Sequence, residues 1–294
     1  SPLNFKTMKK LLPLIILALW SCEKEIDYQI PDPGPQITVD FRLEANEEIL
    51  GMINRSVYSM SNDDPSVLKG ATARIFSDQT NSPFVLEEFE NSDLGFNVTA
   101  YRHPHRLQAG KSYRLEVQHP ELPTLTSTLK VPEQIDILGI TRDPEADELL
   151  IRFKDPAATG NYYKFMIYGT DNDAYPLWFS SADLRLEFFT GGGFDPLEGD
   201  DDVRGYGNEA YLSDRTFNGQ ERVVRLRIEN HVSSPTIEVI MYHISEDEYL
   251  FDRSLAAHSF GDDFFSEPVP VFFNTEGGYG IFTARSKDVV EMAY

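Results

Sequence analysis

The chain has almost no cysteine: one residue, Cys22, in 294. A single cysteine cannot close a disulfide within the chain, and cysteine-ligated zinc or iron–sulfur sites need several thiolates. If Cys22 is chemically modified, as its surroundings predict below, no free thiol remains for nucleophilic catalysis either. These classes of protein are therefore excluded.

Basic residues are also scarce. There are 26 Lys and Arg against 48 Asp and Glu, which gives a formal net charge of -22. Binding to nucleic acid relies on clustered cations that neutralise phosphates, so we expect no nucleic-acid partner. A strongly acidic chain remains soluble and is suited to a surface rich in divalent cations.

Long hydrophobic runs and familiar catalytic motifs are missing as well. The longest apolar stretch, Leu11 to Trp20, has about ten residues and is too short to span a bilayer. The chain contains no His-Glu-x-x-His sequence, no Gly-x-Ser-x-Gly elbow and no phosphate-cradling loop. We therefore predict a non-catalytic protein, with no catalytic residues and no cofactor other than the calcium considered below.

The residues leading to Cys22 have the order of a bacterial lipoprotein signal. Lys9 and Lys10 form a basic start, the apolar run follows, and Ser21 directly precedes Cys22. We predict that residues 1–21 are a signal peptide with upstream residues, and that 22–35 form a lipidated tether. Several acyl chains on one cysteine would anchor a soluble domain stably to a membrane.

The tether begins with an acidic group. Glu23, Lys24 and Glu25 follow the cysteine, and a proline-rich stretch at 31–35 favours an extended chain. In Bacteroidota lipoproteins, a lysine with acidic residues at this place resembles the signal for export to the outer face of the outer membrane. The sequence therefore predicts a lipid-anchored outer-membrane protein that faces the cell exterior.

From residue 35 onward the pattern is mostly β. Residues 36–43 alternate, with Ile37, Val39, Phe41 and Leu43 on one face, and similar strands are separated by Asn, Asp, Gly and Pro turns. We expect two tandem antiparallel β-sandwich domains: an immunoglobulin-like domain at 36–132 and a fibronectin-type-III-like domain at 133–294. Further strands are predicted at 71–76, 84–89, 96–101, 112–118, 125–131, 135–141, 148–154, 162–168, 222–228 and 236–243.

Two departures from this pattern lie in the second half. Residues 180–217 predict a long irregular insertion, and loops of this length are often functional. Ser245 and Glu248 then form a capping-box pattern, which predicts one short helix through about Ala257. Gly277, Gly278 and Gly280 indicate a tight bend with close approach of the backbone.

Candidate binding residues concentrate in the insertion. Its aromatic residues either fill the core or serve as anchors for a partner, and the partner-binding candidates are Phe188, Phe189, Phe194, Tyr206 and Tyr211. Carboxylates are hard ligands that suit calcium, and weak candidates for such a site are Asp195, Glu198, Asp200, Asp201 and Asp202. Asp171, Asn172 and Asp173 form a second short oxygen-rich group that could bind calcium, whereas His103 and His105 could bind zinc but lack a third ligand that can be named.

Several segments together resemble a known family. They are 22–27, 107–117, 125–132, 213–219, the helix at 245–255 and the sequence from Asn274 to Phe282. They are similar to a family of Bacteroidota lipoproteins known only as a domain of unknown function, whose genes typically lie beside those of TonB-dependent outer-membrane receptors. The resemblance covers essentially the whole chain after the signal, and it implies no catalytic residues.

We therefore predict an accessory or substrate-capture subunit of a TonB-dependent receptor at the cell surface. Two alternatives stay open. One is a surface hydrolase of glycans or peptides, which would place clustered carboxylates in a concave pocket. The other is a structural envelope or adhesion module.

Overall fold

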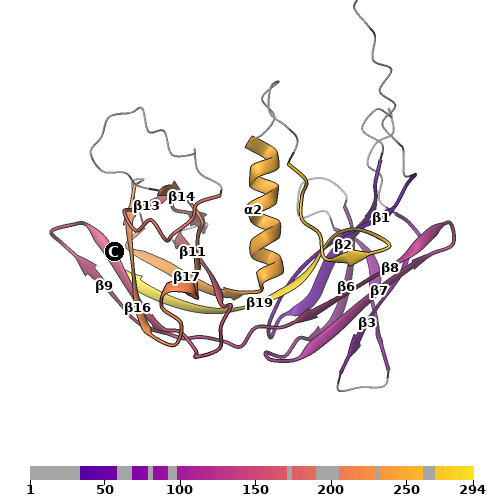
Figure 1. The fold of residues 1–294 in the computed structure, drawn as a ribbon, viewed down its shortest axis with the longest axis horizontal. Helices are drawn as coiled ribbons and strands as arrows, with labels where there is room; N and C mark the ends of the chain where they lie inside the picture. Colours follow the sequence, from indigo (N-terminus) through magenta and orange to yellow (C-terminus); the bar gives the residue numbers. More distant parts are fainter. Residues whose placement is uncertain are drawn as a thin grey trace, which may run out of the picture. The chain divides into compact units, whose positions relative to one another are not determined.

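A computed structural model describes residues 34–57, 68–78, 82–91, 98–170, 174–189, 205–229, 232, 234–260 and 269–294. Residues 35–294 form one compact unit, and it is mostly β (Figure 1). This confirms the predicted fold class. Within the described ranges no helix is long and apolar enough to cross a membrane.

The described strands form three sheets. The long sheet has the order β12-β11-β17-β19-β1-β2-β6-β5, with β15 also paired to β11. Its strands are β1 (Ile37–Glu44), β2 (Glu48–Arg55), β5 (Glu87–Asn91), β6 (Val98–Arg106), β11 (Tyr162–Gly169), β12 (Tyr175–Pro176), β15 (Ala210–Ser213), β17 (Thr236–Ile244) and β19 (Gly278–Ala293).

Two smaller sheets complete the fold. One has the order β18-β8-β7-β3-β4, built from β18 (Thr275–Glu276), β8 (Leu122–Lys130), β7 (Ser112–His119), β3 (Thr72–Ser77) and β4 (Phe84–Val85). The other has the order β14-β13-β16-β10-β9, built from β14 (Gly205–Gly207), β13 (Phe179–Ser181), β16 (Glu221–Ile228), β10 (Glu148–Lys154) and β9 (Ile137–Asp143). The helical elements among the described residues are α2 (Glu246–Phe260) and the short 3-10 turn η1 (Asp214–Thr216).

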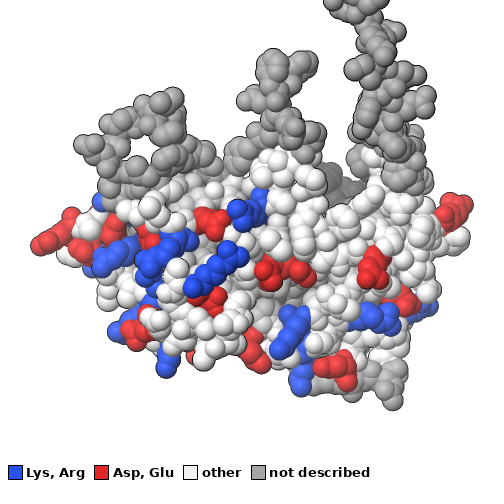
Figure 2. Space-filling view, viewed as in Figure 1, with Lys and Arg blue, Asp and Glu red and all other residues white. Residues whose placement is uncertain are grey.

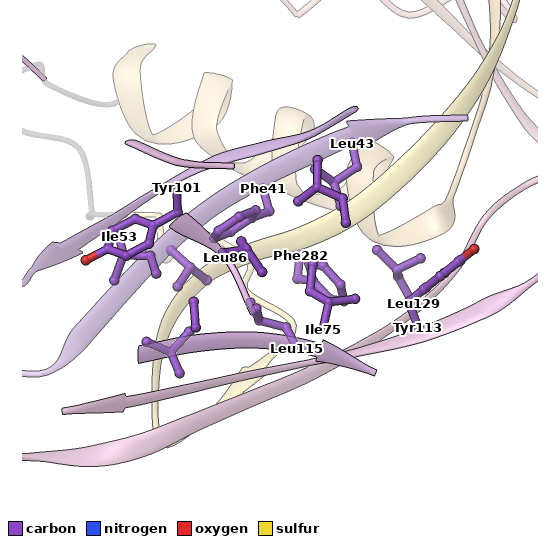
Figure 3. Close-up of a cluster of buried hydrophobic side chains, with 14 of the residues drawn as sticks. Phe41, Leu43, Ile53, Ile75, Leu86, Tyr101, Tyr113, Leu115, Leu129 and Phe282 are labelled. Atoms are coloured by element: carbon purple, nitrogen blue, oxygen red, sulfur yellow. The ribbon is translucent and has the colours of Figure 1, made fainter. Parts of the chain in front are cut away.

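The first hydrophobic core lies between one end of the long sheet and the sheet that contains β7. Alternate residues of β1 point into it, and Ile37, Val39, Phe41 and Leu43 are all buried, as their spacing predicts. Figure 3 shows Phe41 beside Phe282 in this core, with ring centroids 6.3 Å apart in an edge-to-face arrangement. Such a pair of packed sheets is a β-sandwich.

The second core lies between the other end of the long sheet and the sheet that contains β10. Phe153, Tyr163, Phe165 and Phe179 are fully buried there. The predicted boundary between residues 132 and 133 falls in the segment joining β8 to β9, and most core residues separate into two clusters on either side of it. The division into two domains stays a prediction.

β19 belongs to both sandwiches. Its first half pairs in parallel with β1, from Ile37 opposite Gly278 to Glu44 opposite Arg285, and its second half pairs antiparallel with β17. Phe282 therefore packs in the first core, whereas Met292 packs against the second. The last strand of the chain joins the two halves into one continuous sheet.

The joining segment is also fixed to this sheet. The Ser286 hydroxyl donates a 2.6 Å hydrogen bond to the Pro132 carbonyl oxygen, and the Ile137 amide donates one of 2.7 Å to Asp288 Oδ2. A ring nitrogen of His243, Nδ1, lies 2.7 Å from the Glu133 carbonyl oxygen. These bonds cross from the connector to β17 and β19, so the two halves are held by side chains as well as by backbone pairing.

Predictions for the second half need two corrections. Residues 180–217 are not irregular throughout, since β14, β15 and η1 lie within them and β15 pairs with β11. Glycine at 205 and 207 and the shortness of these strands concealed their pattern. The capping box is only half formed: the Ser245 hydroxyl accepts a 3.1 Å bond from the Glu248 amide, but the Glu248 carboxylate bonds elsewhere.

Candidate functional site

A pocket of about 410 Å³ lies between α2 and the long sheet, and we call it the helix–sheet pocket. Figure 1 shows α2 rising beside β17, β11 and β19. The pocket combines charged side chains with apolar walls, and its lining residues are Arg42, Lys164, Phe189, Glu209, Tyr211, Asp252, Leu255, Ala256 and Ser259.

Lys164 is the central charged group of this pocket. It lies on β11 between residues that point into the second core, so its own side chain points to the opposite face, toward α2. Only 5% of the side chain is exposed, and its Nζ lies 2.9 Å from Glu209 Oε1 and 3.6 Å from Asp252 Oδ2. Two carboxylates thus compensate one buried ammonium group.

Tyr211 closes the floor of the pocket. Its hydroxyl lies 2.8 Å from Glu209 Oε2 and 2.9 Å from Asp252 Oδ2, although it has one hydrogen to donate. Burial raises the pKa of Tyr211, and the charges of Asp252 and Glu209 raise it further. The phenol therefore stays protonated, and its one hydrogen is shared between the two carboxylates.

Arg42 adds a second cation from β1. Its guanidinium donates two 3.1 Å bonds to the Asp40 carboxylate and lies 3.5 Å from Asp252 Oδ1. It also lies over the ring of Phe251, 5.1 Å from the centroid. The pocket thus presents positive and negative groups on facing walls, and each is paired with a neighbour.

The charged network continues beneath the start of α2. The Glu248 carboxylate is fully buried; its Oε1 accepts a 3.2 Å bond from Arg285, while its Oε2 has no hydrogen-bond partner in the described part of the chain. Burial raises the pKa of Glu248 despite the attraction of Arg285. Arg285 also lies over the Tyr242 ring, 4.3 Å from its centroid. These contacts fix the first turn of α2 against the sheet.

The predicted partner-binding aromatics have different environments. Phe189 stacks on Tyr211 with centroids 4.3 Å apart, and both are buried, so they form the wall and floor of the pocket rather than exposed anchors. Phe188 is half-buried, 6.0 Å from Phe179. Tyr206 is 40% exposed and stacks on Trp178 at 5.1 Å, so it is the exposed aromatic among these four candidates.

Other predicted sites lie outside the described residues. These are Cys22, Glu23, Lys24 and Glu25 of the tether, Phe194, the acidic group 171–173, and the calcium candidates Asp195, Glu198, Asp200, Asp201 and Asp202. Within the ranges that the structure describes, no group of three or more His, Cys, Asp or Glu side chains is placed to hold a metal ion.

His103 and His105 form a local structural motif. The His105 amide donates a 3.0 Å bond to His103 Nδ1, which occupies one of the two ring nitrogens through which His103 could bind a metal. The Phe84 ring stacks on His105 with centroids 3.9 Å apart, and burial lowers the pKa of His105. The pair therefore stabilises β6 against β4.

Sequence analysis missed the charged residues of the helix–sheet pocket. Lys164 occupies the middle of an aromatic-rich strand, and a lysine at such a place is a detectable signal of a buried ion pair. Its partners Glu209 and Asp252 come from distant elements, and nothing local connects them. Figure 2 shows acidic and basic side chains interspersed on the visible face of the described residues.

Comparisons with known proteins add no chemistry. A cytokine receptor complex matches at 6% identity over 87% of this chain and 95% of that chain, with a TM-score of 0.26. Bovine butyrophilin matches at 11% identity over 90% and 99%, with a TM-score of 0.21. At such low scores neither likeness carries an argument, and no curated protein matches the chain.

The family model described as "Domain of unknown function (DUF4249)" matches residues 23–289. The match begins at the residue after Cys22 and covers all the strands of the three sheets except the end of β19. The chain therefore belongs to the DUF4249 family.

Proposed function

We propose that this protein is a lipid-anchored, surface-exposed outer-membrane lipoprotein that acts as a non-catalytic accessory or substrate-capture subunit of a TonB-dependent receptor. The observation that carries the proposal is the lipoprotein signal ending at Cys22 and followed directly by the start of the family match. A folded unit then begins at Pro35, after a short acidic tether. A soluble unit held at the membrane by lipid chains is suited to capturing substrate at the cell surface.

The helix–sheet pocket supports the capture role. It is concave, has aromatic and aliphatic walls, and contains a few placed polar groups, as small-molecule sites usually do. Lys164, Glu209 and Asp252 are already held by one another, so a polar ligand would meet a preorganised set of charges. Phe189, which lines the pocket, belongs to the predicted insertion at 180–217, in which the candidate partner-binding residues concentrate.

A pull-down tests the accessory role. Wild-type lipoprotein is purified from outer membranes in mild detergent and its partners are identified by mass spectrometry, beside a variant lacking residues 190–204. That deletion leaves β14 and β15 intact, so a thermal melt checks its fold. We expect a TonB-dependent receptor with the wild type and less or none with the deletion. Recovery of no receptor with the wild type would refute the proposal.

A second experiment isolates the anchor. In a Cys22→Ala variant, the expected result is loss of fatty-acid labelling and release of the protein from the membrane fraction. The matched control is Ser21→Ala, which keeps the cysteine. An unlabelled wild type would remove the lipoprotein premise altogether.

A glycan or peptide hydrolase is the second candidate, and one observation favours it. Glu209 and Asp252 both line the helix–sheet pocket and both bond the same hydroxyl, that of Tyr211, so two carboxylates lie close together at one concave site. The discriminating test is turnover of oligosaccharide and peptide panels by wild type and Glu209→Gln. Turnover that Glu209→Gln abolishes would support the hydrolase and count against the capture role.

A further inference from the structure

An exposed aromatic pair lies at the turn that leads into β19. Phe273 is 46% exposed and Tyr279 is 39% exposed, and their rings meet edge to face with centroids 5.4 Å apart. Val269, in the same segment, is 37% exposed. We call Phe273 and Tyr279 the turn aromatics. Both lie within residues 273–282. Neither side chain takes part in the helix–sheet pocket or in its charged network.

Asn274 fixes the turn that carries these rings, because both its backbone and its side chain form hydrogen bonds. Its Nδ2 donates 2.9 Å bonds to Asp247 Oδ2 and to the Phe282 carbonyl oxygen, and its Oδ1 accepts a 3.0 Å bond from the Phe282 amide. Its own carbonyl oxygen accepts a 2.7 Å bond from the Ser127 hydroxyl. The turn aromatics are thus presented by a preorganised backbone.

Packing explains the glycines of this turn but not its tyrosine. A Cβ at Gly277, Gly278 or Gly280 would collide with the backbone of β8 or β1, and φ is positive at Gly277 and Gly280. Tyr279 has no such constraint, since much of its ring faces solvent. A large aromatic side chain at this position is therefore better explained by an external contact than by the fold.

The turn aromatics lie beside the point where the tether reaches the folded unit. In the parallel register of β1 and β19, Thr38 is opposite Tyr279, and the unit begins three residues earlier, at Pro35. Residues 23–34 separate Pro35 from Cys22, and an extended chain of this length reaches at most about 40 to 45 Å. An anchor at Cys22 would thus keep this corner of the unit within that distance of the bilayer.

We propose that the turn aromatics contact the headgroup region of the membrane that holds the Cys22 lipid, and so orient the folded unit on its tether. The proposal rests on the proposed lipidation of Cys22. Aromatic rings with one apolar and one polar end favour this interface, and the hydroxyl of Tyr279 would remain among the headgroups. Glu276 is exposed in the same turn, so neutral lipids are preferred to anionic ones.

Fluorescence quenching on lipid-coupled protein tests the contact. Cys22 is the only cysteine, so the chain from Cys22 onward, which keeps the whole compact unit, can be attached through it to a maleimide lipid in phosphatidylcholine vesicles with brominated acyl chains. The probe is Phe273→Trp, and the control is Leu138→Trp, which replaces a residue of similar exposure, 50%, on β9. The signal of Trp178 is subtracted with the unsubstituted chain.

We expect quenching of Phe273→Trp to exceed that of Leu138→Trp by at least about twofold, because interfacial rings reach the boundary of headgroups and acyl chains. Tyr279→Trp should behave like Phe273→Trp, and raising the content of anionic lipid should reduce quenching of both. Equal quenching of probe and control would overturn the proposal and leave the turn aromatics for a protein partner.

The outcome is independent of natural lipidation, because the maleimide supplies the anchor. Fatty-acid labelling of wild-type cells, described above for Cys22→Ala, tests the premise separately. Labelled protein with unquenched probes would refute only the membrane contact. Quenched probes with unlabelled protein would refute only the biological anchor.

Discussion

Replacing Lys164 by methionine provides a quantitative test of the charged network. Methionine keeps most of the side-chain volume but removes the ammonium that lies between Glu209 and Asp252. Asp252 would keep the guanidinium of Arg42 at 3.5 Å, whereas Glu209 would be left with the hydroxyl of Tyr211. We expect Lys164→Met to lower the free energy of unfolding substantially.

The magnitude follows from burial. Removing one partner of a buried ion pair costs about 3–5 kcal/mol, and because 19% of the Glu209 side chain is exposed the loss should lie near the lower end, at about 3 kcal/mol. Stability of a domain totals about 5–15 kcal/mol. With a urea slope of about 3 kcal/mol per M, the unfolding midpoint should fall by about 1 M.

Urea titration followed by circular dichroism and by Trp178 fluorescence measures this loss. The control is Lys154→Met, an exposed lysine on β10, whose effect should be within about 0.5 kcal/mol of zero. Adding Glu209→Gln to Lys164→Met should restore at least about 1 kcal/mol, because it removes the carboxylate charge that has lost its ion-pair partner. A Lys164→Met midpoint equal to that of Lys154→Met would refute the reasoning.

The remaining predictions concern the backbone and the connector. In the same titration, Gly280→Ala should lower the free energy of unfolding by about 3 kcal/mol or more, because its Cβ would collide with Val39 at a positive φ. Gly160→Ala, with open space around it, should lower it by about 1 kcal/mol. Equal losses would contradict this account. Burial lowers the pKa of His243, so the unfolded chain binds the proton more tightly and stability falls as pH drops below about 6.5. His243→Gln, which can still bond the Glu133 carbonyl oxygen, should show a smaller loss of stability between about pH 7 and pH 5, and an unchanged pH dependence would count against this role.

Local patterns predicted the strands whose two faces differ. β1, β7, β10 and β17 coincide within one or two residues with the predicted ranges, because one of their faces packs against a second sheet. β2 was missed because Gly51 interrupts its alternation; the Phe41 ring occupies the space where a Cβ would lie. The helix was predicted from the Ser245 cap, and its bond to the Glu248 amide is present.

The helix–sheet pocket and β19 could not be predicted from local sequence patterns, because both depend on contacts between residues far apart in the chain. β19 has 16 residues, and its second half carries polar residues such as Ser286 and Asp288. Their side chains form hydrogen bonds with the segment that joins β8 to β9 instead of with solvent. Glu209 and Asp252 meet at Tyr211 although they are far apart in the chain. Such meetings depend on sheet order, which local periodicity does not determine.

The parallel pairing of β1 with β19 has a consequence for biosynthesis. The first strand of the unit can pair with β2 early, but its other neighbour, β19, becomes available only when residues 278–285 have been synthesised, and Phe282 of that strand completes the core around Phe41. Contacts between the two ends of a chain carry the largest loop-closure entropy and form late. A chain that stops before residue 278 lacks the strand that unites both sandwiches, so truncated products cannot reach a nearly native state and stay open to proteases.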